Sequence, residues 1–220
     1  PKNGVCCLGG INIYYCLNDD GTVNEEKFRE AIQMGVYMLN RVTDVTSTGI
    51  QEIDDSVLRE RRIGLGVTGW HDVLIKNKLK YSSAEGRAFV EKWLTFLRDE
   101  SYLASIELSR THGPFPAFDF EGYSKSLFFK SLPRYIRDLI RVHGIRNVTL
   151  NNIPPFGTTG TIWGTSTGDE PHFSGMFMRH SRVGSYLDGC YDFIEYVQKN
   201  GDKNLPDYFE WSHDIGWKEH

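Results

Sequence analysis

A loop rich in glycine and threonine, residues 151–171, carries the residue types that most directly suggest chemistry. It follows a short apolar run, Val148-Thr149-Leu150, which predicts a buried strand. Glycine lets backbone N–H groups approach a ligand, the Thr and Ser hydroxyls add donors, and no carboxylate occurs before Asp169. The loop is therefore predicted to bind an anion, although a Thr-rich surface turn has the same composition.

A second glycine pattern, Gly64-x-Gly66-x-x-Gly69, has the spacing of a dinucleotide-binding fingerprint. That fingerprint requires an apolar strand before the first glycine and an acidic residue about 20 positions later. Here the charged run 59–62 precedes the glycines, and a helix is expected directly after them. We therefore favour close packing between a strand and a helix, and we keep an NAD-binding oxidoreductase as the alternative.

The cysteines and histidines show no metal-binding spacing. The four cysteines are Cys6, Cys7, Cys16 and Cys190. Structural zinc sites use paired cysteines of the C-x-x-C type, and no histidine is close in sequence to the first three. We expect free thiols and predict no metal site. Several histidines occur beside helix ends and turns, where solvated side chains are expected: His71, His112, His143 and His213.

The segment Asp169-Glu170-Pro171-His172 combines carboxylates with an imidazole, which is the composition of a general acid and base pair. Pro171 favours a turn there instead. We therefore expect a structural role for this segment.

The elements that must position these residues alternate between strand-like and helical segments. Strands are expected near residues 5–17, 63–69, 148–150 and 173–178. Helices are expected at 24–40, 54–61, 70–75, 83–109, 133–143 and 192–199, with an irregular connector at 117–131. This alternation favours an α/β fold with mainly parallel strands.

Composition excludes two classes of partner. The 220 residues include 25 Lys plus Arg and 29 Asp plus Glu, giving a net charge of −4 without a basic stripe, so no nucleic-acid partner is expected. No apolar run reaches the roughly 18–20 residues that span a bilayer, and no signal-peptide pattern occurs. We expect no membrane partner and a cytosolic, cytoplasmic location.

Four sequence blocks, in order, resemble the large catalytic subunit of ribonucleotide reductases. Gly4 to Ile13 resembles the family's G-x-C-N-L-G-S-I-N-L strand, and Arg61 to Gly69 its R-R-I-G-L-G-V-x-G segment. Gly144 to Leu150 resembles G-I-R-N-x-T-L. The stretch from Pro155 to Pro171 is similar to the A-P-T-G-T-T-S and G-x-S-S-G-I-E-P motifs.

The resemblance implies a fold and a reaction. The fold would be the second half of the ten-stranded α/β barrel of ribonucleotide reductase, with mainly parallel strands and flanking helices. We expect one domain, 1–220, with the barrel core at about 1–175 and a flanking segment at 176–220. The reaction would be reduction of ribonucleoside di- or triphosphates to 2′-deoxyribonucleotides by thiyl-radical chemistry, which serves deoxyribonucleotide biosynthesis and DNA replication.

The family's N-x-C-x-E motif, which carries the radical cysteine, does not occur in these residues. We therefore expect the isolated chain to be inactive and to need an N-terminal half of the reductase. A half-barrel also has open sheet edges, so a self-associating copy is a second possible partner. The alternative is a catalytically inactive nucleotide-binding or assembly module of the same fold.

The resemblance transfers roles to six residues. Cys6 matches a cysteine that, with a partner thiol, supplies electrons to the ribose and is restored by a thioredoxin-type reductant. Cys7 stands where the family commonly has Asn, and because neighbouring strand residues face opposite sides, only one thiol can point into the barrel; we expect Cys6. The residues matching the loop that binds the substrate phosphates are Phe156, Gly157, Thr158, Thr159 and Gly160, with Phe156 replacing a family Thr.

The subclass expected is the adenosylcobalamin-dependent class II. It is indicated by the run Thr158 to Thr161 and by the run Arg179 to Gly184, which look most like that class. The segment Glu170-x-His172-x-x-Gly175 comes near the signature of His-ligated cobalamin proteins. The class resembled here binds cobalamin without that ligand, so we assign this near match no role.

Overall fold

The structure is a computed structural model that describes residues 3–154, 156–182 and 184–218. Its contacts divide the chain into two compact units, each assembled from segments that are distant in sequence. Unit 1 comprises Pro1–Ile11, Arg29–Gly66 and Leu94–Pro154. Unit 2 comprises Asn12–Phe28, Val67–Trp93 and Pro155–His220.

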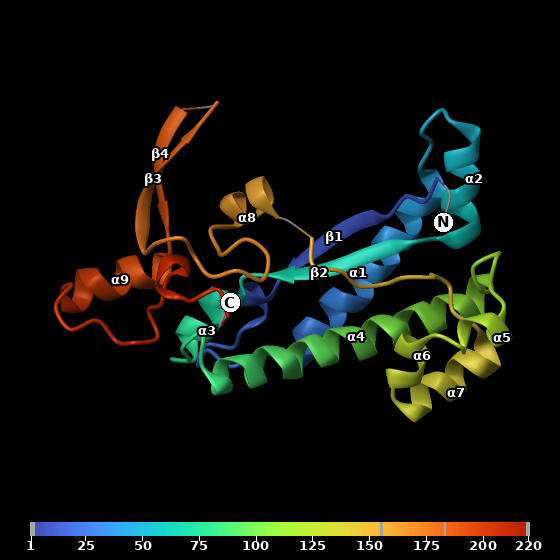
Figure 1. Ribbon diagram of the computed structural model, residues 1–220, viewed down its shortest axis with the longest axis horizontal. Coiled ribbons are helices and arrows are strands. Elements are labelled where there is room, and N and C mark those ends of the chain that lie inside the picture. Colours follow the sequence, from blue (N-terminus) through green and yellow to red (C-terminus); the bar gives the residue numbers. More distant parts are fainter. Residues whose placement is uncertain (1–2, 155, 183, 219–220) are drawn as a thin grey trace. The chain divides into compact units, whose positions relative to one another are not determined.

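Unit 1 is organised around parallel extended segments. Strands β1 (Cys7–Asn12) and β2 (Ile63–Thr68) form a two-stranded sheet and run in the same direction (Figure 1). On the other side of β2, the backbone N–H groups of Ile63 and Leu65 donate to the carbonyls of Thr149 and Leu150. A parallel bridge joins Leu65 to Asn151. The predicted strand at 148–150 therefore lies beside β2, as a short parallel segment.

The helices of unit 1 form mostly where apolar residues recur at helical spacing. Helix α1 (Glu25–Val45), which starts in unit 2, begins after Asn24, whose side-chain oxygen accepts from the Lys27 N–H at 2.9 Å. Its inward side chains, Phe28, Ile32, Val36 and Leu39, are buried. The other helices are α2 (Gln51–Glu60), α4 (Ala84–His112, also starting in unit 2), α5 (Phe120–Tyr123), α6 (Leu127–Ser131) and α7 (Arg134–His143).

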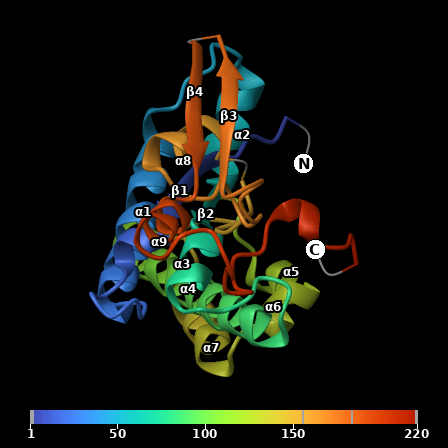
Figure 2. The same cartoon turned by 90° about the vertical axis from the view of Figure 1, so that its left-hand side faces the viewer.

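Unit 2 contains short helices and a hairpin. Its elements are a 3₁₀ helix η1 (Ile13–Cys16), α3 (Trp70–Lys76), α8 (Gly157–Trp163), β3 (Met176–Ser181), β4 (Gly184–Gly189), α9 (Tyr191–Asn200) and η2 (Ser212–Asp214). Strands β3 and β4 pair antiparallel, with Met176 opposite Gly189 and Ser181 opposite Gly184 (Figure 2).

Three predictions of local structure were wrong. The single strand at 5–17 ends at Asn12, because the Asn12 side chain accepts from the Tyr14 N–H at 3.1 Å and starts η1. The connector at 117–131 contains α5 and α6, each capped by a side chain, Asp119 or Ser126. Residues 157–163, predicted as loop, form helix α8.

The fold class is a mixture of helices and strands with parallel pairing in unit 1, as predicted, while the β3–β4 hairpin departs from the parallel pattern. The described residues form two two-stranded sheets rather than a closed barrel. No helix among them has the length and apolar character needed to cross a bilayer.

Candidate functional site

The two adjacent thiols of unit 1 are directed to different surroundings. The Cys7 sulfur lies 4.0 Å from the Thr46 hydroxyl, just beyond the end of α1. Gly9, two residues on and therefore on the same face of β1, packs against Leu39 of α1. Helix α1 thus covers the face of β1 that carries Cys7.

Cys6 directly precedes β1, so it belongs with Leu8 on the face that α1 does not cover. Leu8 remains 50% exposed, and Cys6 is half-buried. Burial raises the pKa of the Cys6 thiol, and Cys7 adds to this, whereas the nearby Arg62 guanidinium opposes it. Cys6 is therefore a protonated, partly accessible thiol at ordinary pH.

The residues predicted to bind phosphate lie in unit 2, at the start of α8. Phe156 is the N-cap residue, and Gly157, Thr158 and Thr159 form the exposed first turn, while Gly160 is buried. The first N–H groups of a helix have no partner four residues earlier, and this turn carries no acidic side chain. The N–H groups and hydroxyls of this turn are therefore available to an anion.

Two of these residues also have packing roles. The Phe156 ring lies 6.2 Å from the Trp163 ring, so the residue that replaces a family Thr packs against the last residue of α8. A Cβ added at Gly160 would collide with the Thr167 side chain. Gly160 thus allows α8 to pack closely on the segment that follows it.

The segment 165–172 is held by the start of α3. Thr68 donates through its hydroxyl to the Ser166 carbonyl at 2.5 Å, and the same hydroxyl accepts from the Gly168 N–H at 3.0 Å. The Ser166 N–H donates to the Asp72 carboxylate at 2.7 Å. Two of the sequence blocks that resemble the family are therefore bonded to each other.

The glycine fingerprint in β2 has a packing role. A Cβ at Gly66 would lie 2.8 Å from the Asn152 carbonyl and would collide with the Pro154 ring. The glycine is needed because the parallel segment 148–154 passes directly over it. This supports the packing interpretation of Gly64-x-Gly66-x-x-Gly69 over the nucleotide interpretation.

A polar group in unit 1, here called the Arg61 cluster, consists of the buried residues Asn40, Arg61, Ser105 and Asn147 and of Asp44, whose side chain is 26% exposed. The Arg61 guanidinium donates to the Asp44 carboxylate at 2.6 Å and to Asn40 at 2.9 Å. Asn147 donates to the Arg61 carbonyl at 2.9 Å and accepts from the Ser105 hydroxyl at 2.9 Å. The cluster joins the Arg61–Gly69 block to the Gly144–Leu150 block.

A second buried group in unit 2, here called the His172 cluster, consists of His71, Asp72, His172 and Cys190. His172 Nε2 lies 2.8 Å from Asp72 Oδ1, and the His172 N–H donates to His71 Nδ1 at 3.0 Å. Ligand atoms of Asp72, His172 and Cys190 all lie within 4.8 Å of one another. The side chains of His172 and Asp72 are 9% and 4% exposed, and Cys190 is fully buried.

Burial dominates the protonation of this cluster. It lowers the pKa of His71 to about 3 and raises the pKa of the Cys190 thiol well above its ordinary value, with the Asp72 charge adding to the latter. The N–H groups of Asp192 and Phe193 oppose that rise, because Cys190 is the N-cap residue of α9. Burial would also raise the pKa of Asp72, but hydrogen bonds from His172 and Ser166 hold it low.

Sequence reasoning missed Asp72 and Cys190 and misplaced His71. His71 was predicted to be solvated, but it is completely buried and lies beside Tyr81, His172 and Trp211. His172 pairs with Asp72 rather than with its sequence neighbours Asp169 and Glu170. No spacing signal connects residues 72, 172 and 190, because they meet only through the fold.

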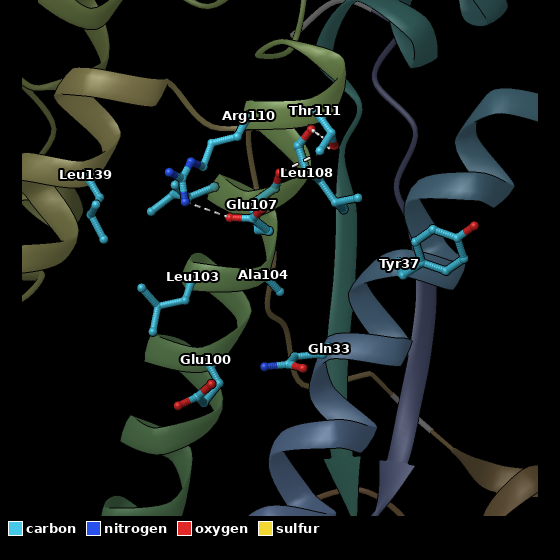
Figure 3. Close-up of a pocket in the computed structure, with 11 residues that line it drawn as sticks. Gln33, Tyr37, Glu100, Leu103, Ala104, Glu107, Leu108, Arg110, Thr111 and Leu139 are labelled. Carbon is cyan, nitrogen blue, oxygen red and sulfur yellow. Dashed lines mark hydrogen bonds and ion pairs between the residues drawn. The ribbon is translucent and has the colours of Figure 1, made fainter.

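Each unit contains cavities. A groove of about 490 Å³ in unit 1 lies between α1 and α4, with Leu139 of α7 at one side (Figure 3). None of the six residues predicted from the sequence lines it. A cavity of about 160 Å³ in unit 2 is lined by Thr161 of α8 and by His172, Arg179 and Asp188. The smaller cavity therefore adjoins the polar groups described above.

Comparison with known proteins identifies relatives over most of the chain. The family model for the ribonucleotide reductase barrel domain matches residues 1–208. The vitamin B12-dependent ribonucleoside-diphosphate reductase of Thermoplasma acidophilum is 33% identical over 83% of the chain and 22% of its own length. The ribonucleoside-diphosphate reductase subunit alpha of Chlamydia muridarum is 29% identical over 96% of the chain and 23% of its own length.

A third relative, the ribonucleoside-diphosphate reductase large chain of Encephalitozoon cuniculi, is 29% identical over 84% of the chain and 25% of its own length. The chain thus spans about a quarter of the length of these curated relatives. Because the family model covers nearly all of the sequence and the four resembling blocks lie within it, the chain belongs to the ribonucleotide reductase barrel-domain family.

Proposed function

We propose that this chain forms the second half of a ribonucleotide reductase catalytic barrel, in which Cys6 is one of the two thiols that reduce the ribose. The observation that supports the proposal is that α1 covers the face of β1 that carries Cys7 and Gly9, because alternation then assigns Cys6 to the uncovered face. In α/β barrels helices cover the outside, so the uncovered face corresponds to the interior. Strands β1 and β2 and the segment 148–152 would be parallel strands of this half-barrel.

The chemistry assigned to Cys6 balances with one partner thiol. Two thiols give two electrons and two protons, the ribose 2′-hydroxyl leaves as water, a hydrogen replaces it, and the thiols become a disulfide. A thioredoxin-type protein would reduce that disulfide by thiol–disulfide exchange. The partner thiol and the radical cysteine would come from residues outside these 220, in the same polypeptide or another.

The start of α8 is proposed to hold the substrate phosphates. The N–H groups of Gly157, Thr158 and Thr159 and the two Thr hydroxyls are exposed, and the helix dipole favours negative charge there. Gly160 is buried and would act by packing. Phe156, which packs on Trp163, would shape the site rather than donate a hydrogen bond.

We propose that both units belong to one barrel domain, because the family model extends through both of them. The core would occupy about residues 1–175, and the segment 176–220 would flank it.

The cofactor proposal rests on the names of relatives. The relatives from Thermoplasma acidophilum and Mycobacterium tuberculosis are named vitamin B12-dependent, while others carry no such name. His172, the imidazole in the near match to a cobalamin-ligand signature, is bonded to Asp72 and nearly buried, so it does not fit as a free cobalt ligand. We propose adenosylcobalamin as the radical source of the complete enzyme and assign none of these residues to hold it.

The adjacent cysteines provide a matched test. In protein that contains these residues together with the radical-cysteine half of the barrel, we measure reduction of ribonucleoside diphosphates and triphosphates with and without adenosylcobalamin. Cys6→Ser is expected to abolish repeated turnover, and Cys7→Ser to retain it. Turnover that survives Cys6→Ser would contradict the assignment.

The phosphate site has its own test. Thr158→Val with Thr159→Val is expected to raise KM for the nucleotide several-fold, because the donors meet charged phosphate oxygens. Thr161→Val is the control, since that hydroxyl donates to the Gly157 carbonyl at 3.1 Å within the helix. Nucleotide binding without turnover in every pairing of halves would favour the inactive-module alternative.

A further inference from the structure

We propose that Asp72, His172 and Cys190 form a binding site for Zn²⁺ in unit 2. The three side chains come from α3, from the segment after α8 and from the junction of β4 and α9. Each offers one ligand atom, and these atoms lie within 4.8 Å of one another. The site shares no residue with Cys6 or with the exposed first turn of α8, and the proposed reductase activity assigns it no role.

The donor set matches what zinc takes in proteins. A thiolate, an imidazole and a carboxylate are all common zinc ligands, with bonds of about 2.0–2.3 Å. In tetrahedral geometry such bonds place ligand atoms about 3.3–3.8 Å apart. The His172–Asp72 separation of 2.8 Å is a hydrogen bond that would open slightly as the ion replaces the proton between them.

The surroundings already orient two ligands. Asp72 Oδ2 accepts from the Ser166 N–H at 2.7 Å, which fixes the carboxylate and leaves Oδ1 directed at His172. The His172 backbone N–H donates to His71 Nδ1 at 3.0 Å, so the residue is held next to a second buried imidazole. Such second-layer hydrogen bonds are what fixes ligand orientation in known metal sites.

Cys190 distinguishes the group from an ordinary buried ion pair. Its sulfur is completely buried beside the Asp72 carboxylate, and no hydrogen bond among the described residues joins it to Asp72 or His172. A buried thiol contributes only packing unless it is a ligand or a nucleophile. A cation at this point would bond the sulfur and offset the charge of the carboxylate.

An ion and its water can reach the site. His172 also lines the cavity of about 160 Å³ in unit 2, together with polar groups that include Glu170 and Ser212. The three protein ligands leave one tetrahedral position, which water from this cavity can fill. The expected role is to fasten α3, the 165–172 segment and α9 together.

The test uses Co²⁺ as a spectroscopic probe on chelator-treated protein that contains these residues. One equivalent of Co²⁺ is expected to produce thiolate-to-cobalt charge-transfer absorption, and Zn²⁺ to abolish it by displacement. Cys190→Ser should remove this absorption, while the control Cys16→Ser, which alters another buried thiol of unit 2, should keep it. His172→Gln and Asp72→Asn should weaken binding by at least about tenfold.

A measurement on the unmodified residues guards against variants that misfold. X-ray absorption of the zinc-loaded protein is expected to show one sulfur and two or three nitrogen or oxygen neighbours at this site. Absence of Co²⁺ binding, charge-transfer absorption that persists in Cys190→Ser, or a shell without sulfur would overturn the proposal and leave a buried hydrogen-bond network. None of these readouts depends on nucleotide reduction, so the site and the proposed reductase function can fail separately.

Discussion

The Arg61 cluster of unit 1 and the His172 cluster of unit 2 are both charged and largely buried, but they differ in how completely their polar atoms are bonded. In the Arg61 cluster every buried side-chain nitrogen and oxygen has a hydrogen-bond partner. In the His172 cluster, within the described part of the chain, the Cys190 sulfur bonds neither Asp72 nor His172, and His71 Nε2 makes no well-formed hydrogen bond.

This difference in hydrogen bonding indicates which cluster is structural and which could also bind a ligand. A buried network whose donors and acceptors are all satisfied is complete, and it holds its elements without needing a ligand. A buried group that contains metal-binding atoms not bonded to one another can still bind a metal ion.

The largest effect is expected from opening the Arg61 cluster. Arg61→Met should lower the free energy of unfolding by about 3–5 kcal/mol, because the buried side-chain oxygen and carbonyl of Asn40 lose their donor and Asp44 loses its buried cation. Urea denaturation of the variant and of the parent protein measures this loss of unfolding free energy.

The control for that prediction uses the same carboxylate. Arg41 also pairs with Asp44, at 2.9 Å, but its side chain is 57% exposed, so Arg41→Met should cost less than about 1 kcal/mol. If the two substitutions lower the free energy of unfolding equally, burial does not determine how much an ion pair with Asp44 stabilises the protein.

An intermediate effect is expected in unit 2. In metal-free protein, Asp72→Ala should lower the free energy of unfolding by about 2–4 kcal/mol, because the Ser166 N–H and His172 Nε2 lose their acceptor inside the unit. Asp72→Asn should cost less, since the amide can accept from Ser166 and donate to a neutral imidazole. Urea denaturation of both variants and of the parent protein gives the two decreases in unfolding free energy. A larger decrease for Asp72→Asn than for Asp72→Ala would contradict the role assigned to these hydrogen bonds.

The smallest effect concerns Glu60, at the end of α2. Burial would raise its pKa, but hydrogen bonds and charge from Arg62 and Arg59 lower it below the ordinary value. The folded state therefore binds fewer protons than the unfolded state, and the stabilisation is present above about pH 4.3 and lost as the pH falls through the folded pKa.

The corresponding variant is Glu60→Gln. It should lower the stability slightly near pH 7, by under about 1 kcal/mol in urea denaturation, and the difference from the parent should shrink as the medium is acidified. Glu52→Gln, on an exposed part of the same helix, is the control and should show no such trend. A gap that widens on acidification would mean that folding raises the pKa of Glu60 instead of lowering it.

The sequence predicted helices best where apolar spacing is sustained. The helix predicted at 83–109 is observed as Ala84–His112, that at 133–143 as Arg134–His143, and that at 192–199 as Tyr191–Asn200. Prediction failed at α8, whose Gly and Thr residues have low helix propensity, so packing such as that of Gly160 on Thr167 decides its conformation.

The candidate sites were predictable only in part. The family resemblance assigned expected roles to Cys6 and to the residues at the start of α8, and alternation along a strand was enough to expect that only one of the two thiols faces inward. The His172 cluster could not be found this way, because Asp72 and His172 are 100 residues apart and no spacing rule connects them. Burial of His71 likewise depends on aromatic side chains from distant segments.

The parallel segments of unit 1 have a consequence for how the chain folds. About 50 residues separate β1 from β2 and about 80 separate β2 from residues 148–152, so each pairing closes a long loop. Chains dominated by such distant pairings fold slowly, in milliseconds to seconds, and expose unpaired strand edges while they do so. We therefore expect helix formation to precede sheet formation during refolding, with a yield that falls as protein concentration rises.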